Sequence, residues 1–189
     1  MTPAVWMPIA SVVLIYFARL KELTTKRDII PGPVREHLTL WLFVLAGSLM
    51  LVCSLGEFLW RGEAMRWPTF GAGWLCAVVS FSLRRRAIAA LGKFWSLHVE
   101  IREQHQFVRG GPFRWVRHPT YLSMILELLV APLILNARYS LLVIPLFFLP
   151  ALLLRLRIEE TALLEKFGHE YRRYKESTPS LLPYKWPRQ

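Results

Sequence analysis

Apolar runs recur along this chain, and charged segments separate them. We expect five membrane-spanning helices, at residues 3–19, 38–56, 68–83, 120–135 and 140–154. The run 38–56 is long enough to cross the ~30 Å hydrocarbon layer of a bilayer. Only NARY separates the last two runs, which is the length of a tight antiparallel helix hairpin. A hydrophobic content of 54% over 189 residues is too high for an ordinary soluble domain. The sequence predicts an all-α polytopic membrane protein in which residues 1–189 form one domain.

Lysine and arginine are distributed unevenly between the two sides of these predicted helices. The segments 19–37 and 84–118 and the tail from Arg155 carry five, eight and eight of them, whereas the other two loops carry three in total. The positive-inside rule therefore predicts an N-terminus outside and a C-terminus in the cytoplasm, with both long basic segments on the cytoplasmic side. The basic triplet 84–86 fits a stop-transfer anchor at the end of the third helix.

Several function classes are excluded by these patterns. The net charge of +11 does not indicate a nucleic-acid partner, because the basic residues lie between hydrophobic spans. Cys53 and Cys76 both lie within apolar runs, so neither a disulfide nor a metal site is expected. The chain also lacks a Rossmann unit of strand, Gly-rich turn and helix.

The segment before the fourth predicted helix, 93–121, concentrates polar chemistry around the sequence GGPFRWVRHPTY. Pro119 fits the start of a helix, where its missing N–H would have no partner in any case. The free N–H groups beyond it form a positive helix end that suits an anionic group. Arg117 and His118 strengthen that positive bias.

The tail continues the fifth predicted helix, so that 155–176 is expected to be helical and to extend beyond the bilayer. Its apolar residues recur at helical spacing and predict one buried stripe: Leu163, Leu164, Phe167, Tyr171 and Tyr174. Arg155 and Glu159 lie four residues apart and share a face. Taken alone, they fit an exposed ion pair that contributes only about 0.3–0.5 kcal/mol.

Two stretches together resemble a known family. The sequence HQFVRGGPFRWVRHPTYLS at 105–123 resembles the signature of the isoprenylcysteine carboxyl methyltransferase family and its phospholipid N-methyltransferase relatives. EETALLEKFGHEYRRY at 159–174 resembles the second motif of that family. Both motifs occur in the family's order and on the same predicted side of the membrane. Phe113 stands where the family usually has Tyr, which removes a hydroxyl, and Ser123 stands where Gly is common.

The resemblance implies an integral membrane methyltransferase that uses S-adenosylmethionine, with 93–121 and 155–176 enclosing the cofactor. Residues implied to line the adenosine and sulfonium region are His105, Phe107, Val108, Gly111 and Phe113, with His98 as a further polar contact. Residues implied near the methionyl end are His118, Pro119 and Tyr121, with Glu159 or Glu160 for the ammonium or a ribose hydroxyl. Arg117 is a further predicted cofactor contact. These residue types fit a ligand that carries a sulfonium, an ammonium and a carboxylate.

The acceptor implied by the resemblance is a lipid or prenylated molecule, most simply the carboxylate of an isoprenylcysteine-like substrate. A carboxylate needs no general base, only a positive group to hold it, and motif position gives Arg155 that role beside Glu159 as the predicted catalytic pair. Glu127 is the one acidic residue deep in a predicted span, and both a packing role and a place on the acceptor's path stay open.

Three alternatives also remain. One is N-methylation of a phospholipid amine, and another is O-methylation of a long-chain phenolic or pyrone lipid. The third is a non-catalytic membrane protein that keeps the fold for assembly or lipid binding.

Overall fold

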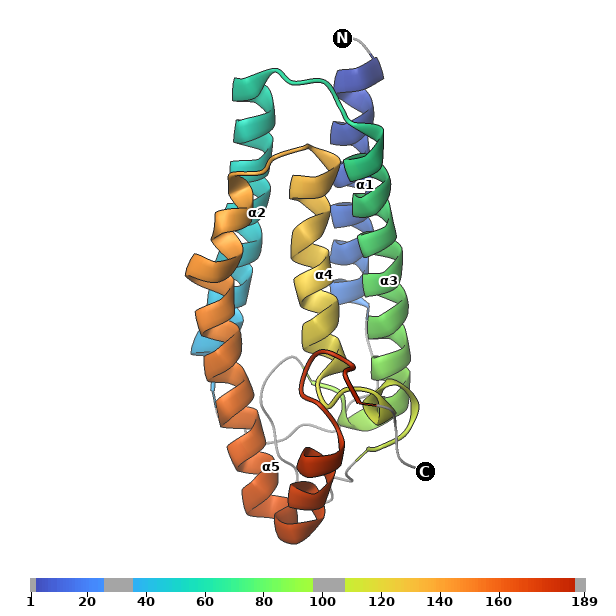
Figure 1. Ribbon diagram of the computed structural model, residues 1–189, viewed down its shortest axis with the longest axis vertical. Helices are drawn as coiled ribbons and strands as arrows, with labels where there is room; N and C mark the ends of the chain where they lie inside the picture. The colour runs from blue at the N-terminus through green and yellow to red at the C-terminus, as the bar shows by residue number, and fades with distance from the viewer. Residues whose placement is uncertain (1–2, 26–35, 97–107, 186–189) are drawn as a thin grey trace.

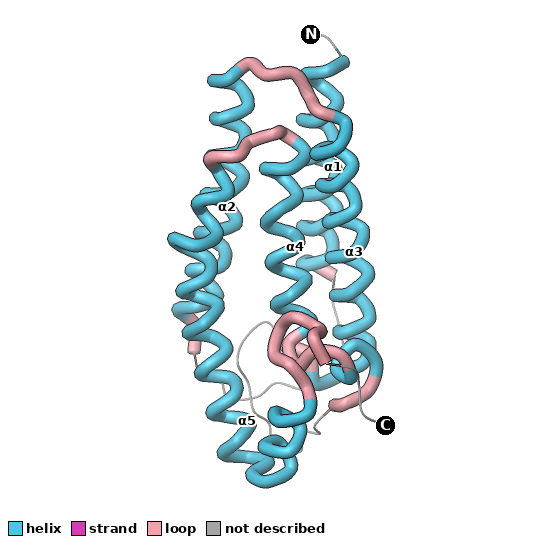
Figure 2. The backbone as a smooth tube through the Cα atoms, in the orientation of Figure 1, coloured by secondary structure: helices cyan, strands magenta, loops and turns pink. Residues whose placement is uncertain are grey.

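Helices account for nearly all the regular structure in the computed structural model, which describes residues 3–25, 36–96 and 108–185. The long helices are α1 (Pro3–Thr24), α2 (Leu38–Arg61), α3 (Trp67–Leu91), α4 (Pro119–Ile134) and α5 (Leu149–Ser177). They run side by side as an elongated bundle (Figure 1), and no strand is drawn among the described residues (Figure 2). The all-α prediction is confirmed.

Two helical stretches are long and apolar enough by themselves to cross a membrane. These are Leu38–Arg61 and Ser140–Ser177, and Pro119–Ile134 is a shorter apolar helix. The surface supports an apolar environment, because large hydrophobic side chains such as Trp41 at 69% and Leu75 at 64% exposure point outward from α2 and α3. Such exposed apolar faces are expected where lipid replaces water as the neighbour.

The first three helices extend beyond their predicted ends. α1 continues to Thr24 instead of 19, α2 continues to Arg61 instead of 56, and α3 continues to Leu91 instead of 83. Arginine is a good helix former, so a basic triplet ends the hydrophobic run without ending the helix. Arg84 is only 4% exposed, whereas the next two arginines are exposed. The interpretation of this triplet as a plain surface anchor is therefore wrong for Arg84, whose side chain turns into the bundle.

The α4–α5 connection is the tight hairpin that the short NARY linker predicts. Asn136 adopts a left-handed conformation with φ of 55°, and the Ala137 N–H donates to the Pro132 carbonyl at 2.8 Å. Glu57 of α2 then accepts hydrogen bonds from the backbone N–H groups of Tyr139 at 3.1 Å and Ser140 at 2.8 Å. A buried carboxylate of a neighbouring helix thus caps the start of the returning segment.

The returning segment reaches α5 through a short 3-10 turn, η3 (Ser140–Leu142), and a π-helical turn, η4 (Ile144–Phe148). A proline lies within the π-helical turn at position 145, and proline interrupts regular helical hydrogen bonding.

The far end of α5 bends at Gly168, where φ is 50° and ψ is −121°. The straight helix and single stripe expected for 155–176 are therefore corrected: the helix continues past 155 as predicted, but its last part turns back beneath the bundle (Figure 1). Tyr171 and Tyr174 are buried there at 1% and 6% exposure. Only glycine adopts this backbone conformation without a steric penalty, so Gly168 permits the bend.

Beyond α5 the chain folds back onto the start of α4. The carbonyl oxygens of Pro179 and Ser180 accept hydrogen bonds from the N–H groups of Arg117 at 2.9 Å and His118 at 3.0 Å. This tail therefore closes the same end of the bundle that the two sequence motifs occupy.

The closest helix contact lies between α3 and α4, where Gly73 faces Ile134. A Cβ atom at position 73 would lie 2.6 Å from the Ile134 Cγ1 and 3.0 Å from its backbone N. Small residues at such contacts allow two membrane helices to approach closely. The same face of α3 contains further small buried residues, Ala77, Ser80 and Ala87.

Gly73→Ala is expected to destabilise the protein by about 1–3 kcal/mol, because the added methyl group overpacks the α3–α4 contact. Gly71→Ala is the matched control, since a Cβ atom at that position meets nothing within 4 Å. Unfolding of both variants in detergent micelles measures the difference. Equal stability of the two variants would show that the contact tolerates the extra atom.

Candidate functional site

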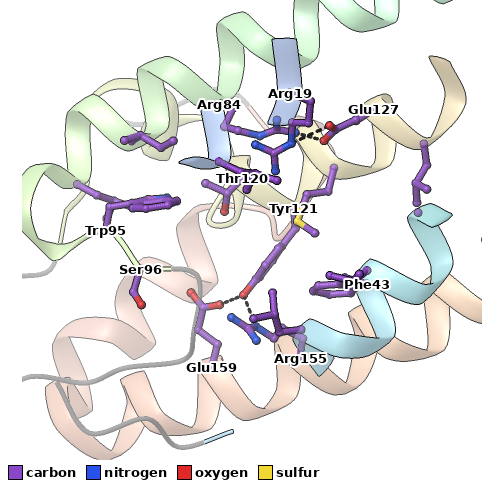
Figure 3. Close-up of a pocket in the computed structure, with 18 of the residues that line it drawn as sticks. Arg19, Phe43, Arg84, Trp95, Ser96, Thr120, Tyr121, Glu127, Arg155 and Glu159 are labelled. Atoms are coloured by element: carbon purple, nitrogen blue, oxygen red, sulfur yellow. Dashed lines mark hydrogen bonds and ion pairs between the residues drawn. The ribbon is translucent and has the colours of Figure 1, made fainter. Parts of the chain in front are cut away.

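A cavity of about 540 Å³ lies within the bundle, with walls from all five long helices. Its lining changes character from one end to the other. A polar cluster from α4 and α5 lies at one end, and a second group of charged residues from α1, α3 and α4 lies at the other end (Figure 3). Much of the remaining lining is apolar.

The first polar group, named here the Arg155 cluster, consists of Thr39, Tyr121, Arg155 and Glu159. The Arg155 Nε donates to the Tyr121 hydroxyl at 3.1 Å, and its Nη1 donates to the Thr39 hydroxyl at 2.9 Å. The Tyr121 hydroxyl in turn donates to a Glu159 carboxylate oxygen. The tyrosine therefore joins Arg155 to Glu159, in place of the simple exposed ion pair that their spacing suggests.

Burial makes this arrangement rigid. Arg155 is 3% exposed and Tyr121 is 8% exposed, yet both line the cavity, as does Glu159. The α2 end supports the cluster: Glu36 accepts hydrogen bonds from the Thr39 N–H and hydroxyl, and it also pairs with the Arg155 Nη1 at 3.4 Å. A buried cation held by several oxygen atoms keeps a fixed position, which is what orientation of an anionic group requires.

A second carboxylate, Glu160, lies beside this cluster and belongs to a different set of contacts. Its Oε1 accepts from Arg117 at 2.6 Å and lies 3.2 Å from the His118 Nε2, and its Oε2 pairs with Lys175 at 2.7 Å. We name these four residues the Glu160 cluster. Because three cationic or titratable groups already surround Glu160, the carboxylate that faces the cavity is Glu159.

The two glutamates also set the protonation of His118, which is 3% exposed. Burial by itself disfavours the imidazolium, but hydrogen bonds and negative charge from Glu159 and Glu160 raise the pKa of His118 above its ordinary value. Burial likewise opposes ionisation of Glu160, yet hydrogen bonds from His118, Lys175 and Arg117 hold the pKa of that carboxyl well below its usual range. The Glu160 cluster is therefore a set of ion pairs that connects the start of α4 to α5.

Aromatic side chains form the wall next to the Arg155 cluster. Trp95, Phe113, Tyr171 and Tyr174 all line the cavity. The Tyr174 hydroxyl donates to the Phe113 carbonyl at 2.6 Å, so the bent end of α5 holds the short helix η2 (Gly111–Arg114) in place. Gly111 has a φ of 59°, a conformation that suits glycine and turns the chain into η2.

This end of the cavity fits a ligand with several kinds of group. A carboxylate from Glu159 suits an ammonium or a sugar hydroxyl, and the aromatic walls suit an adenine ring or a sulfonium. The Arg117 guanidinium, which also pairs with Glu160, adds positive charge to the lining for a carboxylate. S-adenosylmethionine carries all of these groups, so the residues present are compatible with it.

An apolar passage makes up much of the cavity lining. It is lined from α1, α2 and α4 by Leu20, Leu23, Phe43, Val44, Gly47, Leu51, Met124 and Leu128. Leu20 and Val44 are also 58% and 52% exposed, so the cavity reaches the outer surface of the bundle between α1 and α2. An apolar ligand therefore has a route to the Arg155 cluster from the lipid-like surroundings of the helices.

The charged group at the other end, named the Glu127 network, consists of Arg19, Glu22, Arg84 and Glu127. The two Glu127 oxygens pair with Arg19 Nε at 2.8 Å and with Arg84 Nη2. Glu22 accepts from Arg19 Nη1 at 3.0 Å and from Arg84 Nη1 at 3.1 Å. Glu127 is thus paired in the interior, as a packing role requires, and it also lines the cavity, whereas its place on the acceptor's path stays a prediction.

The structure brings most of the predicted site residues together. Those that line the cavity are Val108, Phe113, Arg117, Tyr121, Glu127, Arg155 and Glu159. His118, Pro119 and Glu160 lie directly behind this lining, and Gly111 shapes the turn before it. Three predicted cofactor contacts, His98, His105 and Phe107, lie outside the described residues.

Several residues of the site were not predicted, notably Arg19, Thr39, Arg84 and Trp95. A signal for Arg84 exists in the sequence, because it continues the helical face formed by small residues at 73, 77 and 80. A cation on the buried face of a helix points to an internal partner. Thr39 and Trp95 have no comparable signal, because their role depends on which helices lie beside them.

Comparison with known proteins agrees with this architecture. Residues 74–165 match the model of the isoprenylcysteine carboxyl methyltransferase (ICMT) family. The chain is 28% identical over 156 residues to the protein-S-isoprenylcysteine O-methyltransferase of Schizosaccharomyces pombe, covering 76% of this chain and 66% of that protein. It is 30% identical over 138 residues to the methanethiol S-methyltransferase of Mycobacterium tuberculosis, covering 67% of this chain and 50% of that protein.

A solved structure is also similar. The eukaryotic intramembrane Ras methyltransferase ICMT matches with a TM-score of 0.62 and 26% sequence identity, over 72% of this chain and 52% of that chain. The present chain thus spans between half and two thirds of the length of these relatives. The family resemblance read from the two motifs is confirmed.

Proposed function

We propose that this chain, a member of the isoprenylcysteine carboxyl methyltransferase family, transfers a methyl group from S-adenosylmethionine to the carboxylate of a lipid-borne acceptor. The observation that carries the proposal is the single cavity that joins the Arg155 cluster to an apolar passage. A water-soluble donor needs the polar, aromatic end, and a membrane-dissolved acceptor needs the apolar passage. One cavity supplies both surfaces.

The proposed arrangement in the membrane has five spans within one domain, with the N-terminus outside and the C-terminus in the cytoplasm. The uneven distribution of lysine and arginine supports this orientation. The five long helices lie side by side in one bundle, which supports the proposed number of membrane spans (Figure 1). With this orientation, the Arg155 and Glu160 clusters lie near the cytoplasmic face, where S-adenosylmethionine is available.

For the donor, Glu159 is proposed to hold the ammonium or a ribose hydroxyl of S-adenosylmethionine, and Phe113 and Trp95 are proposed to contact the adenine and ribose rings of that cofactor. When bound, S-adenosylmethionine supplies an electrophilic methyl group on a positively charged sulfur. Tyr121 fixes the Glu159 carboxylate through its hydroxyl, and the Glu160 cluster fixes the start of α4 that carries Tyr121. The chain therefore positions the donor through rigid contacts, which is a large part of what an in-line transfer needs.

For the acceptor, Arg155 is proposed to hold the carboxylate that attacks the methyl group. An ionised carboxylate is already a nucleophile, so no side chain has to remove a proton. The apolar residues of the passage exclude water from the reacting atoms. A buried guanidinium repels an ammonium and favours an anion, so the structure favours a carboxylate over a phospholipid amine as acceptor.

Calorimetry on the detergent-purified protein tests the donor site. The full chain is expected to bind S-adenosylmethionine or its demethylated product, and Glu159→Gln is expected to weaken that binding by about tenfold or more, since a charged hydrogen-bond partner is lost. Glu176→Gln serves as the control, because Glu176 is exposed at the end of the same helix. Absence of binding to the unmodified chain would sink the proposed function.

Mass spectrometry of membranes from expressing cells tests the acceptor class. Methyl esters are expected to increase. An increase confined to N-methylated head groups would instead support the amine alternative.

A further inference from the structure

The Glu127 network has no role in the proposed methyl transfer, although three of its members, Arg19, Arg84 and Glu127, line the same cavity. Glu127 lies eight residues into α4, about 12 Å along the helix axis from Pro119. Ion pairs inside a membrane protein cost desolvation energy that packed hydrophobic residues avoid. A cavity that receives only a hydrocarbon tail would be better lined by apolar residues at this depth.

The two arginines of the network differ in how many of their guanidinium nitrogens have a hydrogen-bond partner. Arg84 is 4% exposed and donates to Glu22, Glu127, Ser80 and Ser123, so each of its three nitrogens has a hydrogen-bond partner. The Arg19 side chain is 19% exposed and lines the cavity. It uses Nε toward Glu127 and Nη1 toward Glu22, and its Nη2 has no hydrogen-bond partner among the described residues.

The network lies at a definite separation from the Arg155 cluster. Tyr121 and Glu127 are six residues apart in α4, which places them about 9 Å apart along the helix axis and on different faces. Figure 3 shows Arg19 and Glu127 together at one end of the cavity, and Tyr121, Arg155 and Glu159 together at the other. Met124 lines the cavity between these two levels of α4. An acceptor whose carboxylate is bound at Arg155 can therefore place a group partway along its tail beside Arg19.

The charges of the network restrict what Arg19 can bind. Two arginines and two glutamates cancel, so the network is neutral when all four are ionised. An additional charged group would leave a net charge in a poorly solvated site. An uncharged oxygen, such as a ketone or a hydroxyl, accepts a hydrogen bond from the Nη2 without that cost.

We infer that the Arg19 Nη2 binds a second, uncharged oxygen on the tail of the acceptor, so that the preferred acceptor is an oxygenated long-chain carboxylate and not a plain hydrocarbon one. This inference rests on the proposed function for the identity of the carboxylate end. It assigns Arg19 a role in specificity: a plain alkyl or isoprenyl tail leaves its N–H groups unpaired against hydrocarbon, whereas a tail oxygen at the right position satisfies them.

The test compares octadecanoic acid with its monoketo derivatives, in which the ketone is moved stepwise along the chain. Binding of each acid to the full chain in lipid nanodiscs is measured by calorimetry with the demethylated donor present. One ketone position, or two adjacent ones, is expected to bind about tenfold or more tightly than octadecanoic acid itself. Affinities that do not depend on the ketone position would overturn the inference.

Variants of Arg19 separate specificity from folding. Arg19→Met is expected to remove the preference for the ketone while it leaves the affinity for octadecanoic acid within a few-fold. Arg19→Lys keeps the charge of the network and is expected to keep part of the preference, which covers the case in which the methionine variant does not fold. A ketone preference that survives in Arg19→Met, or that stays at the full unmodified level in Arg19→Lys, would contradict the role of Arg19.

Failure of this inference is distinguishable from failure of the proposed function. Binding of S-adenosylmethionine is measured separately and does not involve Arg19. If the chain binds S-adenosylmethionine and octadecanoic acid but shows no preference for the ketone, the proposed function stands and the inference about Arg19 is wrong.

Discussion

Arg155→Leu is expected to lower kcat/KM for a carboxylate acceptor by about 100-fold or more. The substitution removes the buried cation that orients the acceptor, and loss of one partner from a buried, hydrogen-bonded charge pair typically costs about 2–5 kcal/mol. It also leaves Tyr121 and Thr39 without the donor that now contacts both of them. Turnover with radiolabelled S-adenosylmethionine and a prenylated carboxylate measures the loss.

Two further variants make this result specific. Arg157→Leu is the matched control, because Arg157 lies two residues along the same helix and is exposed. Arg155→Lys keeps the charge but loses the forked geometry of the guanidinium, so it is expected to recover only part of the activity. Affinity for S-adenosylmethionine is expected to stay within a few-fold in all three variants. Wild-type turnover in Arg155→Leu would show that a group other than Arg155 binds the carboxylate of the acceptor.

Gly47→Trp is expected to abolish transfer to lipid acceptors while donor binding is retained. Gly47 lines the apolar passage, and a Cβ atom at this position meets nothing within 4 Å. The first atom of a new side chain therefore meets no neighbour, and a large side chain is expected to extend into the cavity. Leucine at the same position is expected to give an intermediate loss, because the remaining space decides how much of the acceptor tail fits.

The control for this series is Gly56→Trp on the same helix. Gly56 is exposed, and a Cβ atom there also meets nothing within 4 Å, so the added side chain points away from the cavity. Methylation of a membrane-dissolved acceptor by nanodisc-embedded protein is compared for the two tryptophan variants. Equal activity of both would mean that the acceptor does not pass Gly47.

Much of this fold follows from local sequence patterns. Hydrophobic runs identified the long helices, and the four-residue linker at 136–139 identified the hairpin between α4 and α5. Three of the predicted limits were too short, at 19, 56 and 83. At 19 and 83 the reason is that loss of hydrophobicity does not stop a helix that contains arginine. The bend at Gly168 was missed because a glycine within a periodic apolar stripe is compatible with an unbroken helix.

The candidate site was predictable only where residues are neighbours in the sequence motifs. Arg155, Tyr121 and Glu159 were all expected near one another, but the tyrosine that connects the other two was not. Similarly, the choice between Glu159 and Glu160 depends on the cations that surround Glu160, which come from α4 and from the bent end of α5. These contacts join residues about forty positions apart or come from a turned-back helix, so no local pattern predicts them.

The amino-acid sequence by itself determined that this chain forms apolar helices, where its cationic segments lie and which residues form the two family motifs, because hydropathy, charge and spacing act over a few residues. Only the tertiary structure decided that Arg84 turns inward to meet Glu22 and Glu127, that Thr39 supports Arg155, and that one cavity connects two polar ends. The physical reason is that a buried charge takes its partners from whichever helices pack beside it, and that packing is a property of the whole bundle.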